Sequence, residues 1–472
     1  MAIDEMSTTT LAQGSVAELA ESLRGDLIRP GDPEYNEART IWNGAHDHKM
    51  PALIVRCAGV SDVIRAVEFA RSEELLVSVR GGAHSIPGFS TNDGGIVIDL
   101  SQMKGIRVDP EARTAVAQPG LTWAEFDHET QQFGLAVTGG LVSTTGIPGF
   151  TLGGGVGWLM RKHGLTADNL IAADVVTADG RLVHCSAHEN PELYWGIRGG
   201  GGNFGVAVSL EYDLHQVGPT VTAGAVFYPG HLAGDILRFY REFTQDAPDE
   251  LTTLVSLATA PPAPFLPEEA HGQKGVVIAG MYAGSPDAGE QAFRPLRELG
   301  PKAADLIGPM PYVAMQSILD PLWGPGAYNY FKAGWMGGLD DESIDTLVHY
   351  HQNISSPKSE IHVHHVGGAV ARVPADATAF GDRSQPFLLN VIASTFTSEG
   401  YDEAVEWARN LHGAMDQGLT GGTYVNFLTD QGEDGVRSAY GDKFERLQAL
   451  KDEYDPTNLF RLNQNIPPSR RA

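Results

Sequence analysis

The sequence predicts an α+β protein of two to three domains. From residue 51 to about residue 217, short apolar runs of strand length alternate with stretches of helical periodicity. From residue 220 to about residue 415, longer strands are separated by longer helices, which favours a mostly antiparallel sheet backed by helices. The 472 residues are enough to bury a large core without disulfides or metals.

The first region contains two expected helices, two hairpins and three further strands. Its first helix begins at a Ser-Asp pair, and both residue types cap helix N-termini. The hairpins are predicted because Asp-Pro and Asp-Gly turns separate short apolar runs. The expected strands cover 52–58, 75–79, 95–100, 106–108, 114–117, 174–177 and 181–185. The helices cover 61–74 and 122–133, and the short run WLMRKHG at 158–164 is also helical in pattern.

The middle region and the tail differ from the first region and from each other. The expected strands of the middle region are 222–228, 251–258, 275–282, 360–373 and 387–395, and its helices are 234–244, 288–299, 342–353 and 401–415. The last fifty residues are a polar and aromatic mixture rich in turn residues. A tail of this composition is expected to be docked on the protein.

The composition excludes several classes of partner. A net charge of −26 disfavours nucleic acid and anionic membrane surfaces, because both would repel the chain. The N-terminus has no signal-peptide core, and no segment reaches the roughly 18 apolar residues of a membrane span. We therefore expect a cytoplasmic monomer or homodimer that acts on a small, weakly charged or apolar substrate.

The chain has 56 glycines, and the densest clusters lie between residues 139 and 205. Gly200, Gly202 and Gly205 match the spacing of a dinucleotide fingerprint, but the following run VAVSLEYDL alternates like a strand where a Rossmann unit requires a helix. We therefore reject a Rossmann domain. The glycines at 139–157 and 199–205, with RGG at 80–82, could still bring backbone amides close to one extended phosphate-bearing cofactor.

Histidines at 362, 364 and 365 suggest a metal site, since His362 and His364 share one strand face. No third ligand follows at a suitable spacing, so we expect no metal and favour histidines beside a pocket. The sequence also lacks the GxSxG, HExxH and kinase-type motifs.

Four motifs in order carry a resemblance to a known family. They are RGGAHS at 80–85, GGLVSTTGIPGFTLGGGVGWLMRKHGLTADNL at 139–170, ELYWGIRGGGGNFGV at 192–206 and YDPTNLFRLNQNIPP at 454–468. Together they resemble the berberine-bridge-enzyme-like branch of the vanillyl-alcohol oxidase and p-cresol methylhydroxylase flavoproteins. The similarity covers nearly the whole chain from about Ala38.

The resemblance implies a two-part FAD-binding domain of the p-cresol methylhydroxylase type. Residues 1–37 would be an N-terminal extension, 38–217 and 416–472 would bind FAD, and 218–415 would bind substrate. It implies that His84 is bonded to the flavin 8α-methyl carbon, a bond for which a neutral imidazole is a competent nucleophile. The other implied FAD-binding residues are Arg80, Gly81, Gly82, Ala83, Ser85, Gly88, Gly140, Val142, Thr144, Thr145, Gly146, Gly149, Gly153, Gly154, Gly157, Asn169, Val175, Tyr424, Asn426 and Asn463.

The chain departs from the family pattern at two positions of the loop VSTT. Many relatives attach the flavin a second time through a cysteine, and Val142 stands in its place here. Valine cannot form a thioether, so the expected single link resembles the 6-hydroxynicotine-oxidase-like members. Thr145 occupies the position of the valine that admits oxygen, matching its shape and adding a hydroxyl.

The usual catalytic bases of the family are missing. The run YVNF at 424–427 lacks the second phenol of the family pattern, and Leu389, Val391 and Ala393 form an apolar strand face where relatives carry a glutamate or glutamine. The remaining candidates are Tyr424, His365 with His364, and Tyr330 with Lys332. For each of them a structural role is an equal alternative.

We therefore expect an FAD-dependent oxidase with a largely apolar pocket. It would move a hydride from an alcohol or amine carbon of a small or natural-product-like substrate to flavin N5, and then to oxygen as hydrogen peroxide. Two alternatives stay open, a flavin dehydrogenase with another acceptor and a flavin-loaded binding protein without turnover.

Overall fold

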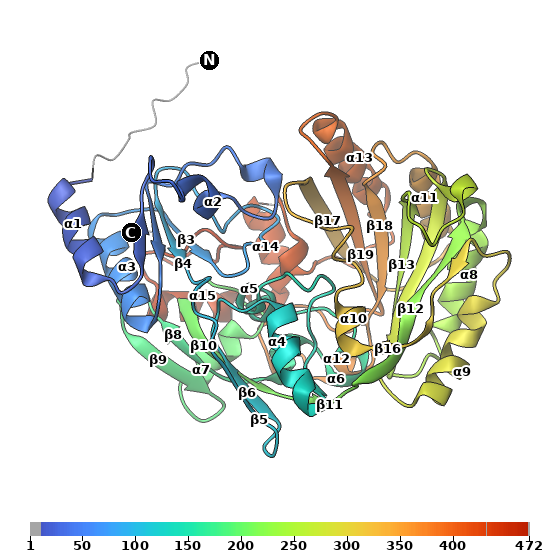
Figure 1. Ribbon diagram of the computed structural model, residues 1–472, viewed down its shortest axis with the longest axis horizontal. Helices are drawn as coiled ribbons and strands as arrows, with labels where there is room; N and C mark the ends of the chain where they lie inside the picture. The colour runs from blue at the N-terminus through green and yellow to red at the C-terminus, as the bar shows by residue number, and fades with distance from the viewer. Residues whose placement is uncertain (1–10, 431, 471–472) are drawn as a thin grey trace.

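The computed structural model describes residues 11–430 and 432–470. Figure 1 shows two halves, with the blue and green elements forming one half and a large yellow and orange sheet forming the other. The C-terminal helices α14 (Gly432–Tyr440) and α15 (Phe444–Tyr454) return to the first half, where α15 packs against α7 (Pro191–Ile197). Among the described residues, no helix is long and apolar enough to cross a membrane.

A four-stranded sheet opens the first half, in the order β1 (Asp26–Ile28), β2 (Leu53–Arg56), β4 (Ile96–Asp99) and β3 (Val77–Arg80). The strands β2, β4 and β3 are parallel and β1 pairs antiparallel at the edge. Helices α1 (Gln13–Ser22) and α3 (Val60–Ser72) bury their apolar faces in the core of this sheet. The expected N-terminal extension thus adds a strand to the sheet from Asp26 on, while residues 1–10 lie outside the described residues.

A five-stranded antiparallel sheet follows, in the order β5 (Ile106–Asp109), β6 (Thr114–Ala117), β10 (Val206–Asp213), β8 (Leu170–Val176) and β9 (Leu182–Ser186). Helix α4 (Trp123–Thr130) begins at a capping box in which Thr122 and Glu125 satisfy each other's backbone N–H groups. The segment after Gly205 is the strand β10, which agrees with the rejection of a Rossmann unit.

The second half is an eight-stranded antiparallel sheet covered on one face by helices α8 (Ala233–Phe243), α9 (Pro286–Arg297), α11 (Asp341–Gln352) and α13 (Tyr401–Ala414). This confirms the expected α+β class with a helix-backed antiparallel sheet. The order is β15 (Ala304–Asp305), β12 (Thr220–Pro229), β14 (Lys274–Tyr282), β13 (Leu251–Thr259), β18 (Glu360–His365), β19 (Phe387–Thr395) and β17 (Tyr328–Met336), with β16 (Gly308–Pro311) beside β12.

Several elements differ from the expected ones. The strand expected over 360–373 ends at His365, because Gly367 and Gly368 adopt positive φ angles of 76° and 55° before the short helix α12 (Ala369–Arg372). The helical run expected at 158–164 contains α6 (Met160–His163). The patterns did not predict α1, β1, α2 (Tyr35–Arg39), β7 (Leu135–Ala136), α5 (Ile147–Leu152), α7, β11 (His215–Gln216), β15, β16, α10 (Tyr312–Gln316), α12, α14 and α15.

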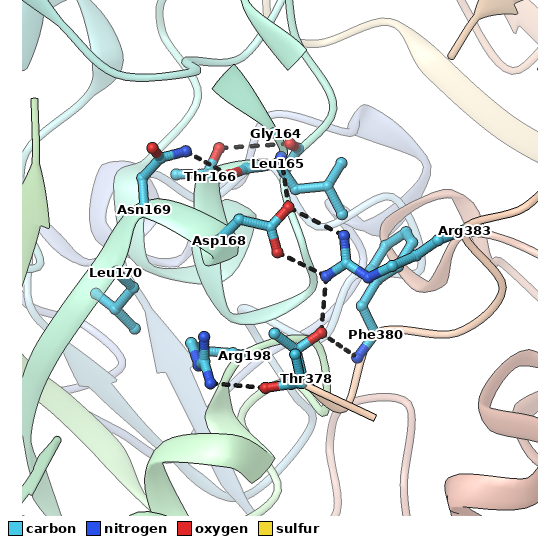
Figure 2. Close-up of polar contacts among 12 residues, drawn as sticks. Gly164, Leu165, Thr166, Asp168, Asn169, Leu170, Arg198, Thr378, Phe380 and Arg383 are labelled. Carbon is cyan, nitrogen blue, oxygen red and sulfur yellow. Dashed lines mark hydrogen bonds and ion pairs between the residues drawn. The ribbon is translucent and has the colours of Figure 1, made fainter. Parts of the chain in front are cut away.

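A buried ion pair joins the connection between β18 and β19 to the first half of the protein (Figure 2). The guanidinium of Arg383 donates to both carboxylate oxygens of Asp168, over 2.9 and 2.6 Å, and a third bond goes to Thr378. The side chains of Arg383 and Asp168 are only 3% and 7% exposed. Asp168 also accepts a hydrogen bond from the backbone N–H of Leu165, so the pair fixes the connection against residues 165–168.

A second buried polar contact lies between α4 and α10. Asp127 is 1% exposed, and Gln316 Nε2 donates to its Oδ2 over 3.1 Å. Burial raises the pKa of Asp127 to about 8, although the hydrogen bond from Gln316 acts in the opposite direction. Because the folded-state pKa exceeds the unfolded value of about 4, the carboxyl contributes stability at low pH that is lost as the pH rises towards 8.

We expect Asp127→Asn to reduce this pH dependence. Between about pH 5 and about pH 8, the free energy of unfolding of the wild type should fall by a few kcal/mol more than that of the variant. Urea unfolding at both pH values measures the difference, with the exposed Asp246→Asn as the matched control. Equal losses in all three proteins would contradict the assignment.

Candidate active site

A cavity of about 360 Å³ lies between the two halves of the protein. Glycine-bearing loops of the first half and one face of the strands β17, β18 and β19 line it. None of its described lining residues is Asp, Glu, Lys or Arg. The cavity is therefore suited to a cofactor held by backbone groups and to an uncharged substrate.

His84 lies on the loop that follows β3 and lines this cavity. Its ring stacks on Trp42, with centroids 5.0 Å apart and planes 20° apart. The hydroxyl of Thr144 lies 3.0 Å from its Nε2 and that of Thr145 lies 3.4 Å from its Nδ1. Burial lowers the pKa of His84 to about 3, so the imidazole is neutral at pH 7.

The two loops that frame His84 touch backbone to backbone. A Cβ on Gly82 would lie 2.3 Å from the N atom of Gly146, and a Cβ on Gly146 would lie 2.2 Å from the N atom of Gly82. Only glycine fits at either position. The loops 80–85 and 140–149 therefore form one continuous wall of the cavity.

The sheet presents alternate residues to the cavity. His362, His364, Asn390, Ile392 and Phe331 line it. In the register His362 lies opposite Asn390, and Ile392 lies opposite Phe331, so these side chains share one face of the sheet. The residues between them pack against the helices on the other face.

Three buried polar atoms that line the cavity have no hydrogen-bond partner in the protein, which is expected where a cofactor and its substrate bind. His364 Nε2, Asn390 Oδ1 and Asn463 Oδ1 are buried without a hydrogen-bond partner, and all three residues line the cavity. Buried polar atoms without partners are destabilising unless a ligand satisfies them. The wall of glycine backbone beside them leaves room for a phosphate-bearing group to approach N–H donors. The residues present fit FAD.

Comparison with known proteins identifies the family. Residues 51–186 match the model of an FAD binding domain, and residues 423–467 match the model named berberine and berberine like. An FAD-linked oxidoreductase of Dictyostelium discoideum is 32% identical, with 96% of this chain and 97% of that protein covered. The chain belongs to the berberine-bridge-enzyme-like family of FAD-linked oxidoreductases.

Oxidases are among the relatives of this protein. The (R)-6-hydroxynicotine oxidase of Paenarthrobacter nicotinovorans is 30% identical over 95% of this chain and 97% of its own. The crystal structure of 6-hydroxy-D-nicotine oxidase from Arthrobacter nicotinovorans superposes with a TM-score of 0.86 at 27% identity, covering 95% of this chain and 99% of that one. A chitooligosaccharide oxidase gives 0.84 at 25% identity, covering 97% and 100%.

Most of the FAD-binding residues that the sequence predicts line the cavity. Those that do are Gly81, Gly82, Ala83, His84, Ser85, Gly140, Val142, Thr145, Gly146, Gly149, Tyr424, Asn426 and Asn463. Thr144 does not line the cavity, but its hydroxyl is hydrogen-bonded to His84, which does.

The other predicted FAD-binding residues pack inside the protein. A Cβ on Gly88, Gly153, Gly154 or Gly157 would lie 2.5 Å or less from His46, Asn426, Phe380 or Gly139 respectively, so these glycines allow close packing of the chain. Arg80 donates to the Ala38 carbonyl, Asn169 bonds to Leu165 and His215, and Val175 lies in the hydrophobic core.

Of the catalytic candidates, the structure brings Tyr424 and His364 to the cavity, and it places His365, Tyr330 and Lys332 elsewhere. His365 lies at the end of β18, bonded through Nε2 to Arg161 over 2.9 Å and packed against Tyr240. Tyr330 donates to Asp430 and accepts from Arg409 of α13. Strand alternation places both on the helix-covered side, and we assign neither a catalytic role.

Sequence reasoning missed residues on the cavity face of the sheet. On β19 the face tested for a base was that of Leu389, Val391 and Ala393, which packs against the helices, whereas Asn390 faces the cavity. The pairing of His362 with Asn390 would have revealed this face, but strand register is not visible in one sequence. Within the described residues, no three His, Cys, Asp or Glu side chains are grouped to hold a metal ion.

Proposed function

We propose that this FAD-linked oxidoreductase is an oxidase acting on a neutral alcohol or amine. Residues 38–217 and 416–472 hold FAD, and residues 218–415 supply the substrate side of the cavity. When bound, FAD would supply the hydride acceptor and the route by which the electrons reach oxygen, which would give hydrogen peroxide. The observation that carries the proposal is one cavity lined by His84, by glycine backbone and by uncharged polar groups of the sheet.

In this proposal His84 carries the single covalent link to FAD. Its ring is neutral, as a nucleophile must be, and Nδ1 is the freer nitrogen because the Thr144 hydroxyl holds Nε2 at the shorter distance. Val142 lines the cavity at the place of the second link of relatives and has no group that could form it. The cavity-lining glycines, with Asn426 and Asn463, complete the binding site.

Tyr424 serves as a hydrogen-bond donor in the proposed site. Its hydroxyl accepts bonds from the Gly155 N–H over 3.0 Å and from Asn426 Nδ2 over 2.8 Å, so its own proton is free for a ligand. Burial raises the pKa of Tyr424 to about 12, although the Asn426 and Gly155 bonds oppose the shift. Tyr424 therefore stays protonated near neutral pH and orients the ligand instead of removing a proton.

Rapid mixing tests the oxidase assignment. The flavin of the purified protein is reduced anaerobically, first by light and then by a panel of neutral alcohols and amines, and the reduced protein is mixed with oxygen. We expect at least one compound to bleach the flavin and oxygen to restore it rapidly with formation of hydrogen peroxide. Slow return with oxygen but fast return with another acceptor would favour a dehydrogenase, and no bleaching by any compound would favour a binding protein.

A further inference from the structure

Three polar side chains form a chain of hydrogen bonds beside the cavity. The Glu360 carboxylate oxygen Oε2 lies 2.7 Å from His362 Nε2 and accepts a bond from Ser256 Oγ over 2.8 Å. Glu360 and His362 are two residues apart on β18, and Ser256 pairs with His362 across β13 and β18, so all three lie on the cavity face of the sheet. Only His362 of the three lines the cavity.

The partners of Glu360 determine which ring nitrogen of His362 carries a proton. Burial raises the pKa of Glu360, but the bonds from His362 and Ser256 and the charge of Lys358 outweigh it and lower the pKa below its ordinary value. The ionised carboxylate can only accept, so Nε2 carries the proton and donates. Nδ1 is then the unprotonated nitrogen, because Nε2 is the atom that bonds to Glu360.

We propose that His362 is the catalytic base of this enzyme and that Glu360 positions it, an inference that rests on the proposed oxidase function. The substrate would give its O–H or N–H proton to His362 Nδ1, and bound FAD would supply the acceptor for the hydride of the adjacent C–H bond. The carbon–heteroatom bond becomes C=O or C=N, and the two electrons of the C–H bond leave with the hydride. Glu360 stabilises the imidazolium that forms.

The residues around His362 define the class of substrate. Asn390 lies opposite His362 in the register, and its buried Oδ1 has no partner. This oxygen and His362 Nδ1 are two acceptors at one end of the cavity, which suits a hydroxyl or amine that donates. Trp323, Phe331 and Phe427 line the cavity as well and suit an aromatic or apolar body. The substrate is therefore a neutral aryl or alkyl alcohol or amine.

Several titratable groups lie near His362. On β18 they are Glu360 and His364, and burial lowers the pKa of His364 well below its ordinary value, so that it stays neutral. Lys358 lies over the ring of Trp323, and that ring lies 6.4 Å from the ring of His362 at an interplanar angle of 87°. Facing strands supply only Ser256 and Asn390, and His84 and Tyr424 line the same cavity from the first half. Of this set, His362 is the residue that lines the cavity with a carboxylate bonded to its second ring nitrogen, which is why we place the base there.

Binding of para-fluorophenol, followed by fluorine NMR on the flavin-loaded protein, tests the base without turnover. We expect the bound phenol to ionise at a lower pH than free phenol, because its proton passes to His362. In His362→Gln this difference should disappear and binding should weaken about tenfold or more. Glu360→Gln should diminish the difference and Glu360→Asp should restore part of it, while the exposed His349→Gln should match the wild type.

Flavin reduction by the compounds of the panel gives an independent measurement. We expect His362→Gln to slow reduction by about 10²- to 10⁴-fold with little change in KM. Wild-type phenol ionisation in His362→Gln, or no saturable phenol binding to the wild type, would overturn the inference. If phenol ionisation depends on His362 but no compound reduces the flavin, the oxidase function fails and the base assignment stands.

Discussion

Replacing His84 with alanine is expected to abolish covalent attachment of the flavin. Wild-type protein precipitated with acid should stay yellow. The His84→Ala precipitate should be colourless, and its flavin should remain in a yellow supernatant. The intact mass of the wild type should exceed the polypeptide mass by one FAD less two hydrogens, because a C–N bond replaces an N–H and a C–H bond and the two hydrogens pass to oxygen. The His84→Ala mass should equal that of the polypeptide alone.

The control for this prediction is another histidine of the same region. His48 is exposed, and only its Nδ1 contacts the Ala45 carbonyl. His48→Ala should therefore keep its flavin through acid precipitation. Flavin that remains attached to the His84→Ala protein would show that a different residue carries the link.

Breaking the Asp168–Arg383 ion pair is expected to cost about 3–5 kcal/mol of unfolding free energy, because the remaining charge is left buried without its partner. Arg383→Met and Asp168→Asn should each show this loss in urea unfolding. The double variant Asp168→Leu with Arg383→Met should recover part of it, since neither buried charge is then left alone.

An exposed pair provides the matched control. Arg372 bonds to Asp249, and their side chains are 62% and 36% exposed. Arg372→Met should therefore cost only about 0–1 kcal/mol, the range of surface ion pairs. A loss of that small size for Arg383→Met would mean that the buried pair contributes little to holding the β18–β19 connection in place.

Local patterns were sufficient to predict most strands and about half of the α-helices, because their apolar residues recur at the period of the element that they form. The alternation after Gly205 gave the correct strand β10 despite the preceding dinucleotide-like glycines. The helix α15 was not predicted, although Phe444, Leu447, Leu450 and Tyr454 lie on one buried face. Its polar residues and the turn-rich segment after it hid that period.

The part of the site that could be predicted from the sequence is the part that lies in glycine-rich loops with a recognisable sequence motif. His84 and the lining glycines lie in loops whose sequence carries the family pattern. The catalytic candidates depend on which face of a strand meets the cavity, and shifting an assignment by one residue moves a side chain to the other face. This is why His365 and Tyr330 were selected, while Asn390 and the Glu360–His362 pair were not.

Several residues that line the cavity lie near the C-terminal end of the chain and are therefore synthesised last. Tyr424, Asn426 and Asn463 line the same cavity as His84, yet more than three hundred residues separate them from it along the chain. A polypeptide still emerging from the ribosome has made the nucleophile but lacks this wall. If His84 forms the proposed link within the complete cavity, the flavin is attached only after translation has passed Asn463.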